Sequence, residues 1–166
     1  NRLLAEGDAD RILILDLDVH QGDGTASLTA GRSDIFTLSL HAEKNFPERK
    51  ARSDLDVALA DGTGDAAYLD ALALVLGPTL DDFRPDLILL QAGVDTHADD
   101  RLGRLSLTDT GLAAREAMVA REAWSRRIPI ASTLGGGYGP DRMAVAWRHA
   151  NAIISLGRGC SGRQKS

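Results

Sequence analysis

Near-continuous apolar runs of strand length, separated by stretches with helical spacing, constrain the fold of this 166-residue chain more than any other feature. The runs are apolar at nearly every position rather than at alternate positions, which is typical of strands buried on both faces of a parallel sheet. Strands that alternate with helices predict an α/β fold with a mainly parallel sheet. The runs comprise residues 12–19, 35–40, 57–59, 86–92 and 128–134.

Apolar residues at helical spacing predict helices over residues 64–83, 109–126 and 140–156. Pro78 is expected to kink or split the first of these, because proline removes a backbone donor inside a helix. Thr108 has the side chain of an N-cap for the second. The third is expected to bury Met143, Trp147 and Ile154.

Composition and charge exclude several classes of protein. With 24 acidic and 19 basic side chains the net charge is −5, so sequence-independent binding to nucleic acid phosphates is not expected. The lone cysteine, Cys160, excludes an internal disulfide framework and a CxxC metal knuckle. No apolar run reaches the ~20 residues that span a bilayer, and the first residues lack the pattern of a signal peptide. We therefore expect a cytoplasmic protein that binds neither nucleic acid nor membrane.

Polar side chains converge where the first predicted strand ends. Period-2 alternation sends Asp16, Asp18 and His20 to one side and the intervening apolar residues to the other. Two carboxylates and an imidazole at the end of a buried strand need a compensating cation, and a metal ion would supply it. The alternative is a hydrogen-bonded cluster or a helix N-cap.

Two further strands deliver candidate residues to the same edge of the sheet. The strand at 86–92 is followed by Asp95, and an Asp-His-Asp set with an open fourth position is typical of a catalytic zinc site. The last strand ends in three glycines followed by Tyr138, whose hydroxyl could serve as a hydrogen-bond donor in a cleft. Taken alone, Asp95 could cap a loop and Tyr138 could be a surface aromatic.

In combination these motifs resemble the zinc-dependent histone deacetylases and their bacterial relatives, which have the arginase/deacetylase fold. The motif runs Asp16-x-Asp18-x-His20-x-Gly22-Asp23-Gly24. Gln21, where many members have a second histidine, and the stretch at residues 100–106 are similar to the class IV branch. The resemblance covers about residues 1–156, the C-terminal half of a deacetylase domain. It implies a three-layer fold that is incomplete on its N-terminal side, and residues 157–166 are expected to form a disordered tail.

The resemblance implies roles for individual residues. Asp18, His20 and Asp95 would bind Zn²⁺, and Tyr138 would assist at the scissile carbonyl. Asp16 and Asp23 would lie behind two active-site histidines. A potassium site would use the side chains of Asp16 and Ser39, with backbone oxygens that include that of Leu40. Substrate-binding positions would be Phe46, Gly136 and Gly137, although Glu48, Asp99 and Arg104 replace residues that are often glycine in the family.

The family's histidine pair, its general base and acid, has no counterpart in this sequence. The four histidines are single, at positions 20, 41, 97 and 149. We interpret His41 and His97 as packing or hydrogen-bonded residues, with cleft lining as the alternative, and His149 as a helix-face residue. One interpretation is that a segment outside these 166 residues supplies the base. The other is a naturally short chain that binds metal but hydrolyses poorly. The truncated sheet of such a chain is expected to expose an unpaired edge that favours self-association.

The predicted function is therefore zinc-dependent hydrolysis of an amide, removing an acetyl or longer acyl group from an acylated lysine peptide or an acetylated small amine. A dinucleotide-binding domain is the first rival, because Gly22-Asp-Gly24 follows a strand, but Ser27 takes the place of the third glycine of that fingerprint. A two-manganese hydrolase of the arginase type would need further ligands, and Gln21 argues against it. A non-catalytic metal-binding or scaffold role is the remaining alternative.

Overall fold

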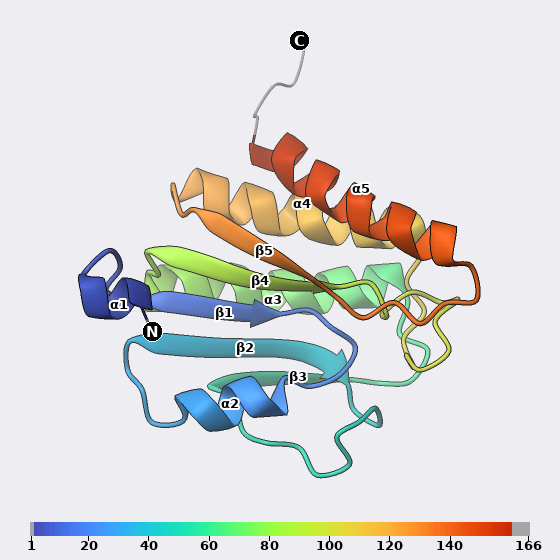
Figure 1. Cartoon of the computed structure of the whole chain (residues 1–166), viewed down its shortest axis with the longest axis horizontal. Helices are drawn as coiled ribbons and strands as arrows, with labels where there is room; N and C mark the ends of the chain where they lie inside the picture. Colours follow the sequence, from blue (N-terminus) through green and yellow to red (C-terminus); the bar gives the residue numbers. More distant parts are fainter. Residues whose placement is uncertain (1, 161–166) are drawn as a thin grey trace.

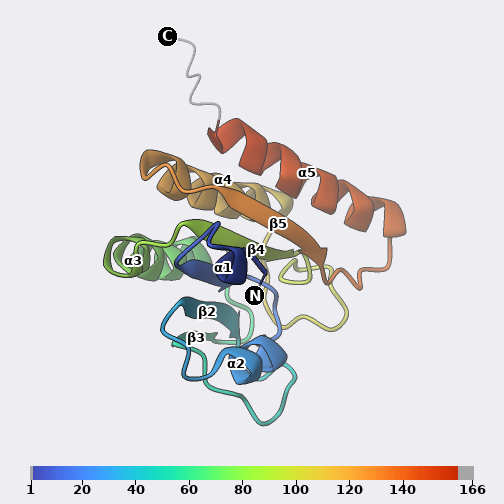
Figure 2. The same ribbon diagram turned by 60° about the vertical axis from the view of Figure 1, so that its left-hand side comes forward.

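The computed structural model describes residues 2–160, which form a layered α/β structure around one parallel sheet (Figure 1). Helix α2 lies on one face of the sheet, and α3 and α4 lie on the other (Figures 1 and 2). The predicted α/β class and mainly parallel sheet are confirmed. The elements are α1 (Arg2–Glu6), β1 (Ile12–Asp16), α2 (Asp23–Thr29), β2 (Ile35–Ala42), β3 (Leu55–Leu59), α3 (Asp65–Phe83), β4 (Leu87–Gly93), α4 (Asp109–Ser125), β5 (Ile130–Gly135) and α5 (Arg142–Cys160).

Strand β1 lies at the centre of the sheet, whose order within the described residues is β3-β2-β1-β4-β5 with every neighbouring pair parallel. Leu15 is in register with Leu38 on one side and Leu90 on the other. All three side chains are buried, and they share one face of the sheet. On the other face Ile14 and Asp16 of β1 are only partly buried, so the predicted burial on both faces is incomplete. The central strand is held on both edges.

Helices α3 and α4 pack on the same face and supply much of the core. Tyr68, Leu72, Leu76 and Leu80 of α3 are buried at helical spacing. Pro78 does not split α3, which is one element from Asp65 to Phe83, because the packed leucines on either side outweigh the single backbone hydrogen bond that proline removes. At the start of α4 the Thr108 hydroxyl accepts a hydrogen bond from Gly111 N, the N-cap that the sequence predicts.

Helix α5 differs from the prediction in two respects. Its apolar residues Met143, Trp147 and Ile154 are 77%, 62% and 41% exposed rather than buried, because α5 packs against α4 through a neighbouring stripe. That buried stripe contains Arg148, Ala152 and Leu156.

The helix also continues to Cys160, so residues 157–160 are helical and not part of the predicted tail. Buried Leu156 anchors the last turns, and Arg158 near the C-terminus is favourably placed relative to the helix dipole. Residues 161–166 lie outside the described residues.

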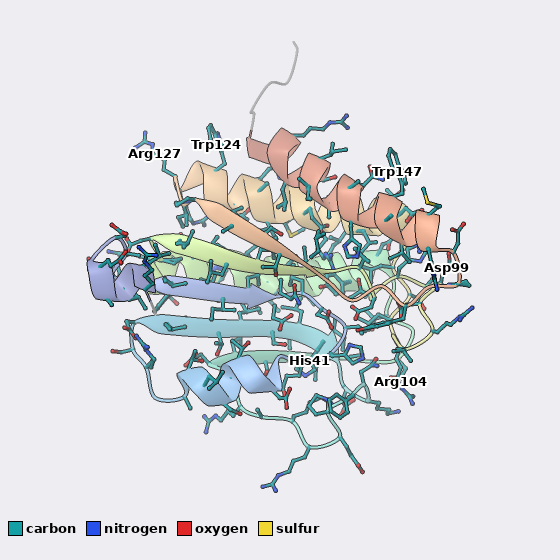
Figure 3. All side chains as sticks on the ribbon, in the orientation of Figure 1. His41, Asp99, Arg104, Trp124, Arg127 and Trp147 are labelled. Atoms are coloured by element: carbon teal, nitrogen blue, oxygen red, sulfur yellow. The ribbon has the colours of Figure 1, made fainter. Side chains whose placement is uncertain are left out.

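The outer edge of β5 is open within the described part of the chain. Residues 131–134 of β5 are all exposed, including Leu134 at 57%. Beside them lies an apolar groove of about 970 Å³ between β5, α5 and the end of α4. Trp124 and Arg127, at the α4 end of this groove, project outward in Figure 3. None of the helices between residues 2 and 160 is apolar over enough of its length to span a bilayer.

Candidate metal centre

The carboxyl ends of β1 and β4 bring polar residues together at one edge of the sheet (Figure 1). Pairing continues one residue past β1, where Leu17 N donates to Gln91 O at 3.0 Å. Beyond that point Leu17 and Val19 are buried in the core. The residues between and beside them, Asp16, Asp18 and His20, are partly accessible, as the period-2 alternation predicts.

Asp18, His20 and Asp95 form a compact triad. The Nδ1 atom of His20 lies 3.0 Å from Asp18 Oδ1 and 3.2 Å from Asp95 Oδ2. One potential ligand atom from each residue lies within 4.8 Å of the other two. Residues 77 positions apart in the chain therefore present their oxygen and nitrogen atoms to one small volume.

Asp95 is the most deeply buried member of the triad, with an exposed fraction of 0%. Its Oδ1 atom accepts a hydrogen bond from Val19 N at 2.9 Å. Its Oδ2 atom lies 3.2 Å from Nδ1 of His20 and has no other polar partner among the described residues. A buried carboxylate oxygen is costly unless a positive charge compensates it, so this atom needs either the imidazolium of His20 or a metal ion.

The three groups strongly perturb one another's protonation. Hydrogen bonds with Asp18 and then Asp95 raise the pKa of His20 to about 10. Burial raises the pKa of Asp95. Burial would also raise the pKa of Asp18, but its hydrogen bonds with His20 outweigh that effect and lower the pKa. Without a metal, the imidazolium of His20 is the positive charge that holds the two carboxylates together.

Three glycines make room for the carboxylates at this edge. A Cβ atom at Gly22 would collide with the carboxylate of Asp16, one at Gly93 with Asp18, and one at Gly136 with the carboxylate of Asp95. Gly136 also has a positive φ of +62°, a conformation that favours glycine. The predicted substrate-binding glycine Gly136 therefore packs directly against a triad residue, and Gly137 follows it with a φ of +96°.

The triad has the chemistry of a divalent metal site. Two carboxylate oxygens and one imidazole nitrogen suit zinc, and three protein ligands leave a fourth position open. The contact between Asp95 Oδ2 and the His20 ring and the raised pKa of His20 both indicate a site that favours positive charge. These observations show that the residues present fit a metal ion.

The predicted potassium-site residues lie behind the triad, on β1 and β2. Asp16 is in register with Ser39, and Ser39 and Leu40 are buried. Asp16 Oδ1 accepts a hydrogen bond from Asp18 N at 3.1 Å. Burial raises the pKa of Asp16 to about 7, so this carboxyl is easily protonated in the absence of a nearby cation.

The remaining predicted site residues are not part of the triad. Tyr138 is 49% exposed, and its backbone N donates to Asp100 Oδ2 at 2.6 Å. Phe46 is 73% exposed on the loop after β2. Asp23 is the first residue of α2, a position where a carboxylate also favours the helix dipole.

Two of the other histidines are held by hydrogen bonds. His41 is buried beside Ser39, whose Oγ lies 3.0 Å from His41 Nδ1, and burial lowers its pKa. His97 Nδ1 accepts from Asp99 N at 2.9 Å. These contacts agree with the interpretation of His41 and His97 as hydrogen-bonded residues. His149 lies in α5 as predicted, and its buried Nδ1 has no hydrogen-bond partner among the described residues. Gln21 is buried and donates to Ala51 O at 2.9 Å.

Two residues near the triad were not predicted. Asn45 joins the loop after β2 to the loop after β4: its Nδ2 donates to Leu102 O at 2.6 Å and its Oδ1 accepts from Arg104 N at 2.9 Å. No local sequence pattern indicates such a bridge. Arg115 is fully buried within α4. Its position on the same helical stripe as Leu112 and Val119 is a signal that could have identified it.

Comparison with known proteins identifies the family. The model of the histone deacetylase domain matches residues 1–154. The chain belongs to the histone deacetylase domain family. Family membership agrees with the resemblance seen in the sequence motifs. The triad is therefore the candidate metal site of a chain that belongs to a family of amidohydrolases.

Several known proteins resemble this chain over most of its length. It is 48% identical over 144 residues to an uncharacterized protein of Picosynechococcus sp., covering 87% of this chain and 48% of that protein. It is 36% identical over 128 residues to a histone deacetylase-like amidohydrolase of Pseudomonas aeruginosa, covering 70% and 33%. The crystal structure of an acetylpolyamine aminohydrolase from Burkholderia pseudomallei shares the fold with a TM-score of 0.73 at 22% identity, covering 95% and 46%. The chain thus spans about half, or less, of the length of these proteins.

Proposed function

We propose that this chain carries the metal-binding part of a zinc-dependent amide hydrolase that removes acetyl or longer acyl groups from acylated lysine or a related amine. The observation that supports this most strongly is the convergence of Asp18, His20 and Asp95, in which a buried oxygen of Asp95 contacts the His20 ring at 3.2 Å. The same three residues match the family's ligand motif. Membership of the family supports the reaction class.

In this proposal Asp18, His20 and Asp95 hold the zinc ion. When bound, zinc supplies a Lewis acid for an amide carbonyl and lowers the pKa of a coordinated water toward ~7. Val19 N fixes one oxygen of Asp95, which leaves the other oxygen directed to the site. His20 gives up its proton when metal binds, because a histidine ligand must be neutral.

Tyr138 is proposed to stabilise the oxyanion that forms when water attacks the carbonyl. It follows the glycines of the β5 loop, and the hydrogen bond from its backbone to Asp100 fixes that loop. A hydroxyl donor on the developing negative charge is typically worth about 3–4 kcal/mol. Phe46 and Gly137 are proposed to line the substrate channel on either side.

A monovalent cation, potassium, is proposed at Asp16, Ser39 and Leu40. The adjacent positions of Asp16 and Ser39 on paired strands support it. The raised pKa of Asp16, caused by burial, also supports it, because a nearby cation would keep this carboxylate ionised. The motif positions of Asp16 and Asp23 imply that they lie behind the two active-site histidines of the family. We propose that they act on those histidines, which would come from outside this sequence.

Acylated amines are the proposed substrates. The net charge of −5 favours encounter with cationic molecules such as lysine-containing peptides or polyamines. The fold shared with an acetylpolyamine aminohydrolase is compatible with either. We propose that the protein acts in the cytoplasm and binds neither a membrane nor nucleic acid.

The general base is proposed to come from outside these 166 residues. His41 and His97 are held by neighbouring groups, and the sequence contains no adjacent histidine pair. A positioned base contributes about 10²–10⁴-fold to the rate. The second candidate function is therefore that of a metal-binding chain with weak hydrolysis, which the same triad supports.

A dinucleotide site is disfavoured by the geometry at Gly22. The Gly22 backbone packs against the carboxylate of Asp16, and Asp23 begins α2. A phosphate at this helix start would therefore meet two acidic side chains, whereas dinucleotide sites offer backbone N–H groups without such charges.

The proposal is tested with acyl-lysine peptides and acetylpolyamines. Turnover is compared between the 166-residue chain and a fusion in which the N-terminal half of the 48%-identical relative precedes it. We expect slow or no turnover by the chain alone and zinc-dependent turnover by the fusion, lost on chelation and restored by zinc. A folded, zinc-loaded fusion without activity on any of these substrates would contradict the proposed reaction. Brisk zinc-dependent turnover by the chain alone would contradict the proposal that the general base lies outside these 166 residues.

A further inference from the structure

Arg115 of α4 is a charged residue enclosed in the core directly beneath the triad. Its exposed fraction is 0%. One guanidinium nitrogen, Nη1, donates to Leu17 O at 3.0 Å and to Thr96 Oγ1 at 3.2 Å. The other, Nη2, donates to Gly93 O at 2.9 Å. The guanidinium therefore contacts two separate strand ends.

The acceptors adjoin the metal-ligand residues in the sequence. Leu17 immediately precedes Asp18, while Gly93 and Thr96 flank Asp95. The two strand ends are also in close contact, since a Cβ atom at Gly93 would collide with Asp18. Arg115 thus joins the segment carrying Asp18 and His20 to the segment carrying Asp95. Without it, two buried carbonyl groups would lose a donor.

The charge of Arg115 is neutralised by its neighbour in the sequence, Glu116. Glu116 Oε1 accepts from Arg115 Nη2 at 2.6 Å and from Nε at 3.2 Å, and Glu116 is 1% exposed. Burial would lower the pKa of Arg115, but the charge of Glu116 raises it. The guanidinium therefore stays ionised, and the pair adds no net charge beneath the site. Its effect on the triad comes from hydrogen-bond geometry.

We infer that Arg115 is a positioning residue that sets the spacing of Asp18 and Asp95, and so the affinity and geometry of the metal site. This inference rests on the proposed metal-binding function. Arginine is required because its planar fork can donate to several acceptors at fixed angles, whereas lysine offers one compact ammonium group. Residues that orient metal ligands from behind typically change metal affinity 10–100-fold when replaced.

The experiment measures Co²⁺ binding to the purified, metal-free chain by absorption spectroscopy, together with its melting temperature. In Arg115→Lys we expect Co²⁺ affinity to fall by about 10–100-fold and the visible bands of bound Co²⁺ to change in position or intensity. The spectral change reports ligand geometry, which a general loss of stability would not alter. If Arg115→Lys does not fold, the double variant Arg115→Met/Glu116→Leu, which leaves no unpaired buried charge, is measured instead.

Two control variants separate positioning from stability. Val119→Ala removes buried contacts one turn further along α4, so its melting temperature should fall while Co²⁺ affinity and spectrum stay those of the wild type. Arg126→Lys changes an arginine that pairs with Asp81 and Glu122, away from the triad, and should alter neither.

The outcomes distinguish the inference from the proposed function. A folded Arg115 variant with wild-type Co²⁺ affinity and spectrum would overturn the inference and leave the metal site intact. A wild-type chain that binds no Co²⁺ would overturn the metal site itself, and with it the role of Arg115. Reduced affinity with an altered spectrum in the Arg115 variant alone would support the inference.

Discussion

The central strand β1 and the edge strand β5 differ sharply in how completely they are paired and hydrogen-bonded. β1 is paired on both edges, and the segment that follows it is held by hydrogen bonds from Val19 N to Asp95 and from Arg115 to Leu17 O. β5 is paired with β4 alone among the described strands, and its residues 131–134 are exposed. The candidate metal ligands therefore lie in the rigid centre of the sheet, and Tyr138 lies on the loop after the open strand.

This difference indicates which part of the chemistry the chain can carry by itself. Metal binding depends on β1 and β4, whose ends are fixed by buried contacts. In the proposed function, catalysis depends also on Tyr138, on the open side, and on a base from outside the 166 residues. We expect metal binding and turnover to respond separately to substitutions on the two sides.

The largest effect is expected at the centre, from Asp95→Asn. Asparagine can still accept the hydrogen bond from Val19 N through its carbonyl oxygen, so the fold should be retained. The loss of the buried negative charge should lower zinc affinity by more than ~100-fold. Replacing a residue that only orients a metal ligand typically has a smaller effect. Competition with a chromophoric chelator measures the affinity, and Asp61→Asn, at an exposed carboxylate paired with Arg104, is the control. Unchanged zinc affinity in Asp95→Asn would exclude this residue as a ligand.

On the open side, Tyr138→Phe in the active fusion should lower turnover by roughly a hundredfold and leave zinc affinity unchanged. The hydroxyl is the only group removed, and the backbone hydrogen bond to Asp100 is retained. Steady-state kinetics on an acyl-lysine peptide and a zinc titration measure the two effects. Equal turnover in the variant and its parent would show that Tyr138 does not stabilise the oxyanion.

The isolated chain should self-associate through the open edge of β5. Exposed strand edges pair with other chains, and the apolar groove between β5 and α5 adds surface that favours contact. Leu134→Lys combined with Ile153→Glu should shift the isolated chain toward monomer by at least ~10-fold in dissociation constant, an expected 1.4 kcal/mol or more. Light scattering coupled to gel filtration measures this, with Leu28→Lys on exposed α2 as the control. A wild-type chain that is monomeric at high concentration would contradict the prediction.

The stability of the metal-free chain should also depend on pH, through the contacts of His20 with the two carboxylates. The pKa of His20 is about 10 in the folded protein against 6.5 as its ordinary value. A raised folded-state pKa contributes stability that is complete below the unfolded value and is lost as pH rises through the folded one. The melting temperature should therefore fall between pH 6.5 and 10, by about 2–4 °C for each kcal/mol lost. Thermal denaturation of wild type and His20→Gln measures this, and a wild-type slope no steeper than that of the variant would be the contrary result.

Much of this arrangement could be predicted from the sequence because it depends on local patterns. The alternation at Asp16, Asp18 and His20 is a property of one strand, and Asp95 follows from the rule that parallel strands end at the same edge. Residues whose role depends on packing between distant segments could not be predicted in this way. Arg115 contacts residues 98 and 22 positions away, and the stripe containing Trp147 is apolar in sequence yet exposed in the structure.

Zinc anomalous diffraction from crystals of the 166-residue chain tests the central claim most directly. The account predicts one strong anomalous peak per chain, bounded by Asp18, His20 and Asp95, with zinc-to-ligand distances of about 2.0–2.2 Å. A well-ordered chain grown with zinc that shows no peak among these side chains, or shows its strongest peak elsewhere, would contradict it.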